Sequence, residues 1–206
     1  MKLFHSPASP FVRKVLISAH ERGIADRLEL VRAVVSPIAR DERVSAHNPS
    51  GHIPTLLLDD GNALYDSGVI CQYLDALHGG EPLFPVDPER SIRALCLQAL
   101  CDGVLDAGVL MRFEAGLRPE AMRWPAWYDG QRTKVRSSLA VLERDWMSWL
   151  AGPLDIGIIT AACALGYLDF RFPQDPWRPE HPVLARWYEN FSRRDSMLAT
   201  QHSAVV

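Results

Sequence analysis

The chain has a hydroxyl residue at the start of a predicted helix, directly after a short predicted strand over residues 2–5. Ser9 is followed by Pro10, a pattern typical of an N-cap with proline at the first helical position. The first turn of a helix leaves main-chain N–H groups unpaired, and the helix dipole favours negative charge there. The turn is therefore suited to a thiolate with Ser9 as hydrogen-bond donor, although an ordinary cap has the same sequence.

Two further motifs have ligand-binding chemistry. Ile53-Pro54 precedes the apolar run 55–58, and a cis bond at this proline would turn the main-chain groups of Ile53 toward a peptide ligand, although trans is the commoner state. Asp66-Ser67 begins another helical pattern, where the carboxylate suits an ammonium group and the free amides suit a carboxylate. A plain helix cap would again look identical.

These three motifs, in this order, resemble the soluble glutathione S-transferase family, and the resemblance covers essentially the whole chain. Ser-Pro-Phe at residues 9–11 and Gly-Tyr-Leu-Asp-Phe at residues 166–170 resemble a bacterial branch of that family. The resemblance implies that Ser9 contacts the thiol of glutathione and that the Ile53–Pro54 bond is cis. It also implies that Asp66 and Ser67 hold the γ-glutamyl end.

The same resemblance extends the glutathione-binding set to Phe11 and His52. Related proteins often have a basic or amide side chain at the position of His52, where it reaches the glycyl carboxylate; an ordinary loop histidine is the other interpretation. The resemblance further implies a homodimer, a small hydrophobic electrophile as second substrate, and an electrophile pocket between the domains beside the long helix around 105–112.

Hydrophobic periodicity divides the chain into two domains. Residues 1–78 follow the order β-α-β-α-β-β-α, including a short helix predicted over 36–46. This order fits several small α/β layer folds, and the resemblance selects a thioredoxin-like domain. Residues 79–88 hold three prolines and two glycines and are predicted to be a linker. Residues 89–206 are predicted to be an all-helical domain, with helices over 89–117, 127–150, 156–170 and 183–193.

Composition excludes several classes of function. The 206 residues are 48% hydrophobic with a net charge of -3, which supports a substantial core and disfavours nucleic acid as a partner. The N-terminus lacks the apolar core of a signal peptide and no apolar run is long enough to span a bilayer, so we expect a cytoplasmic protein without a membrane partner. The histidines form no metal motif, and no metal is expected. The four cysteines lack C-x-x-C spacing and are predicted to be free, buried thiols: Cys71, Cys96, Cys101 and Cys163.

The predicted reaction is conjugation of glutathione to an electrophilic carbon. Redox relatives have Cys-Pro-x-Cys where this chain has residues 9–12, so disulfide chemistry at that turn is disfavoured. Two alternatives stay open: a non-catalytic scaffold that binds proteins, and a glutathione-dependent reductase or isomerase.

The helix predicted from Ile156 departs from many relatives at its start. Asp155 is its expected N-cap, but Ile158 stands where a capping box would have a carboxylate. The pattern predicts a weaker helix start, which Ile158→Glu would strengthen by about 1 kcal/mol.

Overall fold

The computed structural model describes residues 1–77 and 79–204, which form two compact units. One unit is Met1–Val86 together with the described chain from Arg194 onward, and the other is Asp87–Arg193. His78, the last residue of the predicted first domain, lies outside the described residues.

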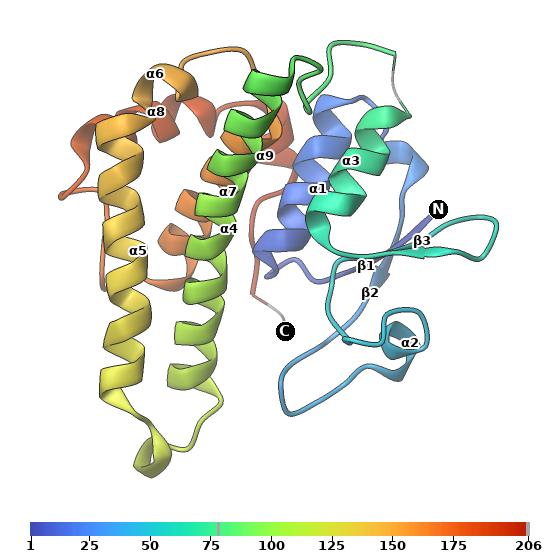
Figure 1. The fold of residues 1–206 in the computed structure, drawn as a ribbon. Helices are drawn as coiled ribbons and strands as arrows, with labels where there is room; N and C mark the ends of the chain where they lie inside the picture. The colour runs from blue at the N-terminus through green and yellow to red at the C-terminus, as the bar shows by residue number, and fades with distance from the viewer. Residues whose placement is uncertain (78, 205–206) are drawn as a thin grey trace. The chain divides into compact units, whose positions relative to one another are not determined.

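The N-terminal unit has a four-stranded sheet in the order β2-β1-β3-β4 (Figure 1). Its strands are β1 (Lys2–His5), β2 (Glu29–Arg32), β3 (Thr55–Leu57) and β4 (Ala63–Leu64). β1 is parallel to β2 and antiparallel to β3, which is antiparallel to β4. Leu3 and Phe4 are both buried, and since side chains alternate along a strand they serve the cores on opposite faces of the sheet.

Helices cover both faces of this sheet (Figure 1). α1 (Pro10–Glu21) and α3 (Ser67–Ala76) pack against each other on one face. The short α2 (Glu42–Ser45) lies on the other face, where Val44 packs with Phe4 and Ala33. This α/β/α layering confirms the thioredoxin-like fold that the resemblance implies for the N-terminal domain.

The prediction of a helix over 36–46 is wrong about its start. Ser36 and Ala39 pair with each other through two main-chain hydrogen bonds, at 2.9 and 3.2 Å, which close a tight turn. The side chain of Asp41 then accepts the main-chain N–H of Arg43 at 3.1 Å and caps a helix that begins at Glu42. The capping carboxylate, rather than Ser36-Pro37, sets where α2 begins.

Among its described residues the second unit has helices joined by turns and loops and no strand, which confirms the predicted all-helical domain. Its elements are α4 (Pro88–Gly116), the short turn η2 (Glu120–Met122), α5 (Pro125–Asp145), α6 (Met147–Leu150), α7 (Ile156–Arg171) and α8 (Pro182–Phe191). The single helix predicted over 127–150 is divided at Trp146 into α5 and α6.

α7 is the central helix of this unit, since every residue over 156–168 is buried. It packs mainly against α4. A Cβ at Gly157 would lie 2.6 Å from the main-chain oxygen of Ala94, so only glycine allows the two backbones to approach this closely.

The C-terminal segment packs with the N-terminal unit, whereas the sequence assigns it to the helical domain. Its helix α9 (Asp195–Ala199), which the sequence analysis did not predict, packs against α1. Arg194 donates two hydrogen bonds to the carboxylate of Glu21, at 2.8 and 2.7 Å.

Two other sequence-based expectations concern α4 and the cysteines. Within the described part of the chain, α4 is the one helix that is long and apolar enough to cross a membrane, and half of its most apolar window is buried inside the protein, as in a core helix. Cys71, Cys101 and Cys163 are buried as predicted, but Cys96 is exposed.

Candidate functional site

The strand register brings the three predicted motifs to one edge of the sheet. β1 ends at His5, and the turn that carries Ser9 follows it. Phe4 pairs with Thr55, so the start of antiparallel β3, directly after Pro54, lies beside the end of β1. β4 is antiparallel to β3 and therefore ends at this same edge, where Asp66 follows it. We refer to this edge, with Ser9, Pro54 and Asp66, as the ligand edge.

Ser9 caps α1 as predicted, and Pro10 is the first helical residue. The hydroxyl oxygen of Ser9 accepts the main-chain N–H of Val12 at 3.3 Å, and the side chain is half-buried. A serine hydroxyl accepts through its lone pairs and donates through its proton, so capping leaves the proton of Ser9 for a ligand. The two interpretations of Ser9, as a cap and as a thiolate donor, are therefore compatible.

The first turn of α1 also has an aromatic ring next to a buried cation. Phe11 is half-buried, and Nζ of Lys14 lies 5.8 Å from the centre of its ring, within the range of a cation–π contact. The side chain of Lys14 is fully buried. The sequence analysis did not single out Lys14.

The Ile53–Pro54 peptide bond is cis, as the resemblance implies. The loop before it is held by Asn48, a buried residue whose amide nitrogen donates to the carbonyl of His52 at 3.1 Å and to Oγ1 of Thr55 at 3.0 Å. Among the described residues nothing hydrogen-bonds to the main chain of Ile53. The side chain of His52 is exposed.

Asn48 is a residue of this edge that the sequence analysis missed as an anchor. Its side-chain oxygen accepts from both the main-chain N–H and the hydroxyl of Ser50, at 3.1 and 2.8 Å. The available signal was the Asn-Pro-Ser-Gly turn, because asparagine side chains commonly bond to the backbone two residues on.

Asp66 caps α3 with one carboxylate oxygen, which accepts the main-chain N–H of Gly68 at 2.6 Å. The side chain is exposed, so its second oxygen faces solvent, whereas Ser67 is buried. The Tyr65–Asp66 bond is also cis. The first turn of α3 thus combines an exposed carboxylate with the unpaired amides of a helix N-terminus.

His5, at the end of β1, adds a titratable group to the ligand edge. Burial lowers the pKa of its imidazole, and the neighbouring Arg32 on β2 lowers it further. The lowered pKa favours the uncharged imidazole of His5 at neutral pH. Within the described residues, no group of histidines, cysteines and carboxylates is arranged to hold a metal ion.

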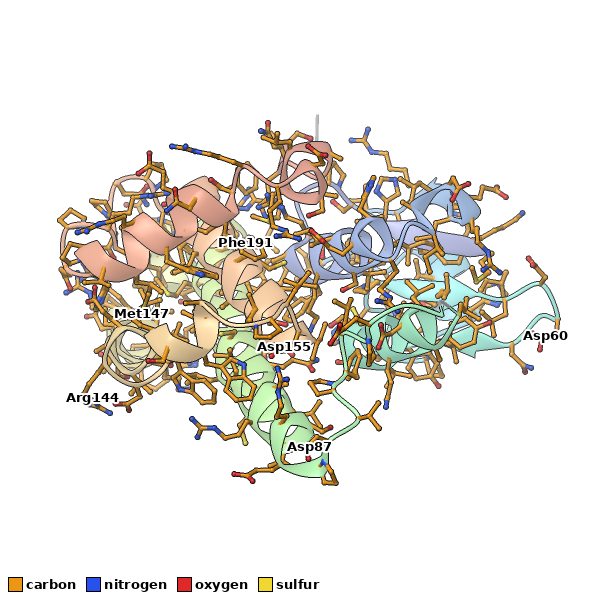
Figure 2. The ribbon with its side chains drawn as sticks, turned by 90° about the horizontal axis from the view of Figure 1, so that it is seen from above. Asp60, Asp87, Arg144, Met147, Asp155 and Phe191 are labelled. Carbon is orange, nitrogen blue, oxygen red and sulfur yellow. The ribbon has the colours of Figure 1, made fainter. Side chains whose placement is uncertain are left out.

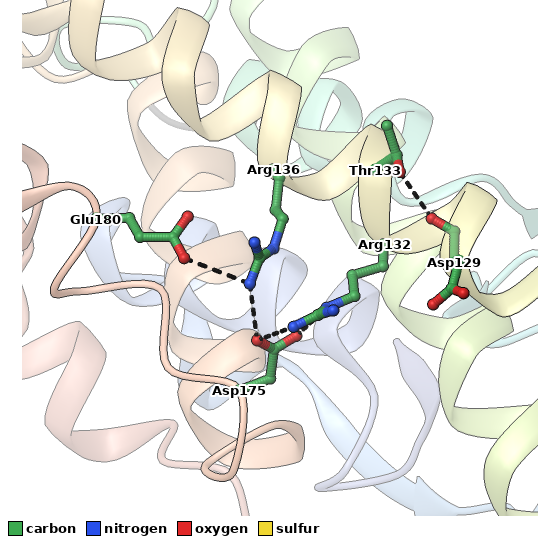
Figure 3. Close-up of polar contacts among 6 residues, drawn as sticks. All are labelled: Asp129, Arg132, Thr133, Arg136, Asp175 and Glu180. Carbon is green, nitrogen blue, oxygen red and sulfur yellow. Dashed lines mark hydrogen bonds and ion pairs between the residues drawn. The ribbon is translucent and has the colours of Figure 1, made fainter.

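One charged cluster of the helical unit joins α5 to the segment after α7 (Figure 3). Asp175 accepts two hydrogen bonds from Arg132, at 2.5 and 2.6 Å, and one from Arg136 at 3.1 Å. Arg136 also pairs with Glu180 at 3.3 Å. Because each of these arginines already has a carboxylate partner, the cluster ties the structure together and offers no open anion site.

Comparison with known proteins assigns the class of protein that this fold and edge define. Residues 8–77 match the family described as glutathione S-transferase, N-terminal domain, and residues 125–190 match its C-terminal domain. The chain belongs to the glutathione S-transferase family.

Individual relatives cover nearly the full length of the chain. It is 34% identical to the uncharacterized GST-like protein YibF of Escherichia coli K12, over 98% of both chains. A glutathione transferase family member from Pseudomonas fluorescens Pf-5, solved with bound glutathione, is 51% identical with a TM-score of 0.97, over 98% of this chain and 99% of that one. A second structure of a Pf-5 family member holds S-(propanoic acid)-glutathione and is 50% identical with a TM-score of 0.92, over 99% and 100% of the two chains.

Proposed function

We propose that this protein is a glutathione transferase that binds glutathione at the ligand edge, stabilises its thiolate and transfers the sulfur to an electrophilic carbon of a small hydrophobic molecule. The observation that carries the proposal is the hydroxyl of Ser9, which caps α1 at the ligand edge and keeps a proton to donate. The relatives with bound glutathione or its thioether support the same choice of co-substrate.

The chemical task of this site is to lower the pKa of a thiol. A free thiol ionises near pH 8.5, so neutral solution holds mostly the less reactive protonated form. Ser9 ionises far too high to act as a base, but its hydroxyl donates to the sulfur anion beside the positive end of the α1 dipole. A hydrogen bond to a charged group stabilises by roughly 1.5–3 kcal/mol, which corresponds to one or two pKa units.

The rest of the ligand edge matches the remaining groups of the tripeptide. The main-chain N–H and C=O of Ile53 suit the cysteinyl backbone, and Asp66 suits the α-ammonium group. Ser67 and the first amides of α3 suit the α-carboxylate. His52 suits the glycyl carboxylate, and Phe11 completes the set beside Ser9.

In the reaction, the thiolate sulfur forms a bond to the electrophilic carbon. In a substitution the leaving group departs with its electron pair, and in an addition the neighbouring carbon takes up a proton. Glutathione carrying a propanoic acid on sulfur, as bound in the Pf-5 relative, has the thioether bond that such an addition forms.

Several finer assignments are part of the same proposal. The bacterial Ser-Pro-Phe branch, a homodimer and a role in detoxification rest on the family resemblance, and a cytoplasmic location rests on the sequence analysis. The domain limits 1–78 and 89–206, with a linker over 79–88, also remain predictions.

The first test is calorimetric titration with reduced glutathione at neutral pH. We expect micromolar to low-millimolar binding by the wild type and about tenfold weaker binding by Asp66→Ala, which loses a charged hydrogen bond. Asp60→Ala is the matched control, because this exposed carboxylate lies in the β3–β4 turn, at the opposite edge of the sheet (Figure 2). Absence of binding by the wild type would overturn the proposal and favour the protein-binding scaffold.

A further inference from the structure

Two residues of the C-terminal segment, His202 and Ser203, contact the turn that carries Ser9. The carbonyl of Pro7 accepts a hydrogen bond from Nδ1 of His202 at 3.1 Å and one from the main-chain N–H of Ser203 at 3.4 Å. Because a carbonyl only accepts, the Nδ1 atom of His202 carries the proton in this contact. Two donors from the far end of the chain thus converge on one carbonyl, two residues before Ser9.

The carbonyl of Pro7 is part of the central peptide of this turn. The hydrogen bond that closes the turn does not involve this peptide and so does not restrain it. The turn runs from Ser6 to Ser9 and is closed by the Ser9 N–H donating to the carbonyl of Ser6 at 3.0 Å. Its central peptide joins Pro7 to Ala8, and rotation of this peptide distinguishes the common turn types. The N–H of Ala8 donates to Oγ of Ser6 at 3.4 Å, and His202 and Ser203 hold the opposite side.

The rest of the segment is anchored along α1, so His202 does not rest on the turn alone. Arg13 is buried and donates to the carbonyl of Met197 at 3.2 Å and to Oγ1 of Thr200 at 3.5 Å. Arg194 pairs with Glu21 in the last turn of α1. The segment therefore follows α1 from its last turn to the turn before its first residue, and the anchors fix where His202 lies.

We propose that His202 is a positioning residue for Ser9: by donating to the carbonyl of Pro7 it fixes the central peptide of the Ser6–Ser9 turn, and with it the direction in which the Ser9 hydroxyl donates. This inference rests on the proposed function of Ser9 as the donor to the glutathione thiolate. His202 itself does not touch the sulfur. Loss of its donor changes how much of the bound glutathione is ionised and leaves the peptide-binding contacts at Ile53 and Asp66 intact.

The test measures the pKa of bound glutathione from the ultraviolet absorbance of its thiolate in three variants. We expect His202→Ala to raise this pKa by about half a unit to one unit, which lowers the acid dissociation constant of the bound thiol by about three- to tenfold. His202→Asn should restore most of the loss, because its side-chain amide has a donor near the position of Nδ1. His20→Ala, an exposed histidine in the last turn of α1, is the control and should leave the pKa unchanged.

A double-variant cycle shows whether His202 acts through Ser9. In a Ser9→Ala background, His202→Ala should cause no further rise in the pKa of bound glutathione, since the donor that it positions is gone. The same rise in both backgrounds would overturn the inference. An unchanged pKa in His202→Ala alone would also overturn it.

Amide hydrogen exchange separates this inference from the proposed function. Exchange at the Ser9 N–H, which closes the turn, should be faster in His202→Ala than in the wild type when no glutathione is present. If exchange is faster in His202→Ala but the wild type does not bind glutathione, the role of His202 in the turn stands and the proposed function is refuted. Unchanged exchange would refute the role of His202 whether or not glutathione binds.

Discussion

The side chains of two helix N-caps in this protein differ in how much of their hydrogen-bonding capacity is left after capping. Ser9, at the start of α1, is half-buried, and its hydroxyl accepts one main-chain N–H and keeps its proton. Asp155, at the start of α7, is buried, and both of its oxygens are occupied: one accepts from the N–H of Ile158 at 3.0 Å, the other from Nε1–H of Trp149 at 2.8 Å. The comparison shows that a cap residue of any type is a candidate ligand contact when its side chain can still donate or accept a hydrogen bond after capping.

The largest effect on stability is expected for Ile158→Glu, which tests whether the cap at Asp155 has room for a further polar group. The sequence pattern predicts that Ile158→Glu strengthens the start of α7, but Ile158 is only 1% exposed, so the new carboxylate would be buried without a partner. We expect a loss of about 3 kcal/mol or more in the free energy of unfolding, measured in urea. Ile158→Val is the control, with an expected loss of about 1 kcal/mol. A more stable Ile158→Glu variant would show that the cap has room for a capping box.

The next effect compares a buried cap with an exposed one. Asp155→Ala removes the cap and leaves the indole N–H of Trp149 unpaired, so we expect a loss of about 2–3 kcal/mol in unfolding free energy. Asp87 caps α4 through a single bond from Arg90 at 2.9 Å and is exposed, so Asp87→Ala should lose only about 1 kcal/mol. Equal losses in chemical denaturation would contradict the distinction between the two caps.

Substitution of Ser9 should lower catalytic activity much more than stability. Ser9→Ala removes the donor to the thiolate, so kcat/KM for an electrophile at neutral pH should fall by about 10- to 100-fold while glutathione still binds. Activity should recover as the pH approaches the pKa of free glutathione, and stability should fall by only about 1 kcal/mol. A pH–rate profile identical to that of the wild type would remove Ser9 from the mechanism.

Local chemistry made much of the fold and the edge predictable. The cap residues Ser9, Asp66 and Asp155 each accept a hydrogen bond from a residue two or three positions further along the chain. The starts of these three helices can therefore be predicted from the local sequence. The strand pairing that brings the motifs to one edge follows from the layer order of the predicted fold.

The contacts that the sequence did not reveal depend on packing. His202 reaches Pro7 across 195 residues of chain, and nothing near either residue in sequence indicates the other. Trp146 divides one predicted helix without a proline or glycine to mark the break. The burial of Ile158, which reverses the expected sign of its substitution, likewise depends on the helices around α7.

The smallest expected effect is on how the unfolding free energy depends on pH, through His5 at the ligand edge and Asp155 at the start of α7. Burial and Arg32 lower the pKa of His5 below 6.5, so the folded state binds this proton less readily, and the unfolding free energy falls as the pH drops from 6.5 to the lower folded value. Burial raises the pKa of Asp155 above 3.8, so the unfolding free energy rises as the pH drops from that raised value to 3.8. In urea unfolding across this range, His5→Gln should flatten only the slope below pH 6.5, and Asp155→Ala only the opposing slope at acid pH. If His5→Gln left the first slope unchanged, His5 would not be the group at the ligand edge that couples folding to pH.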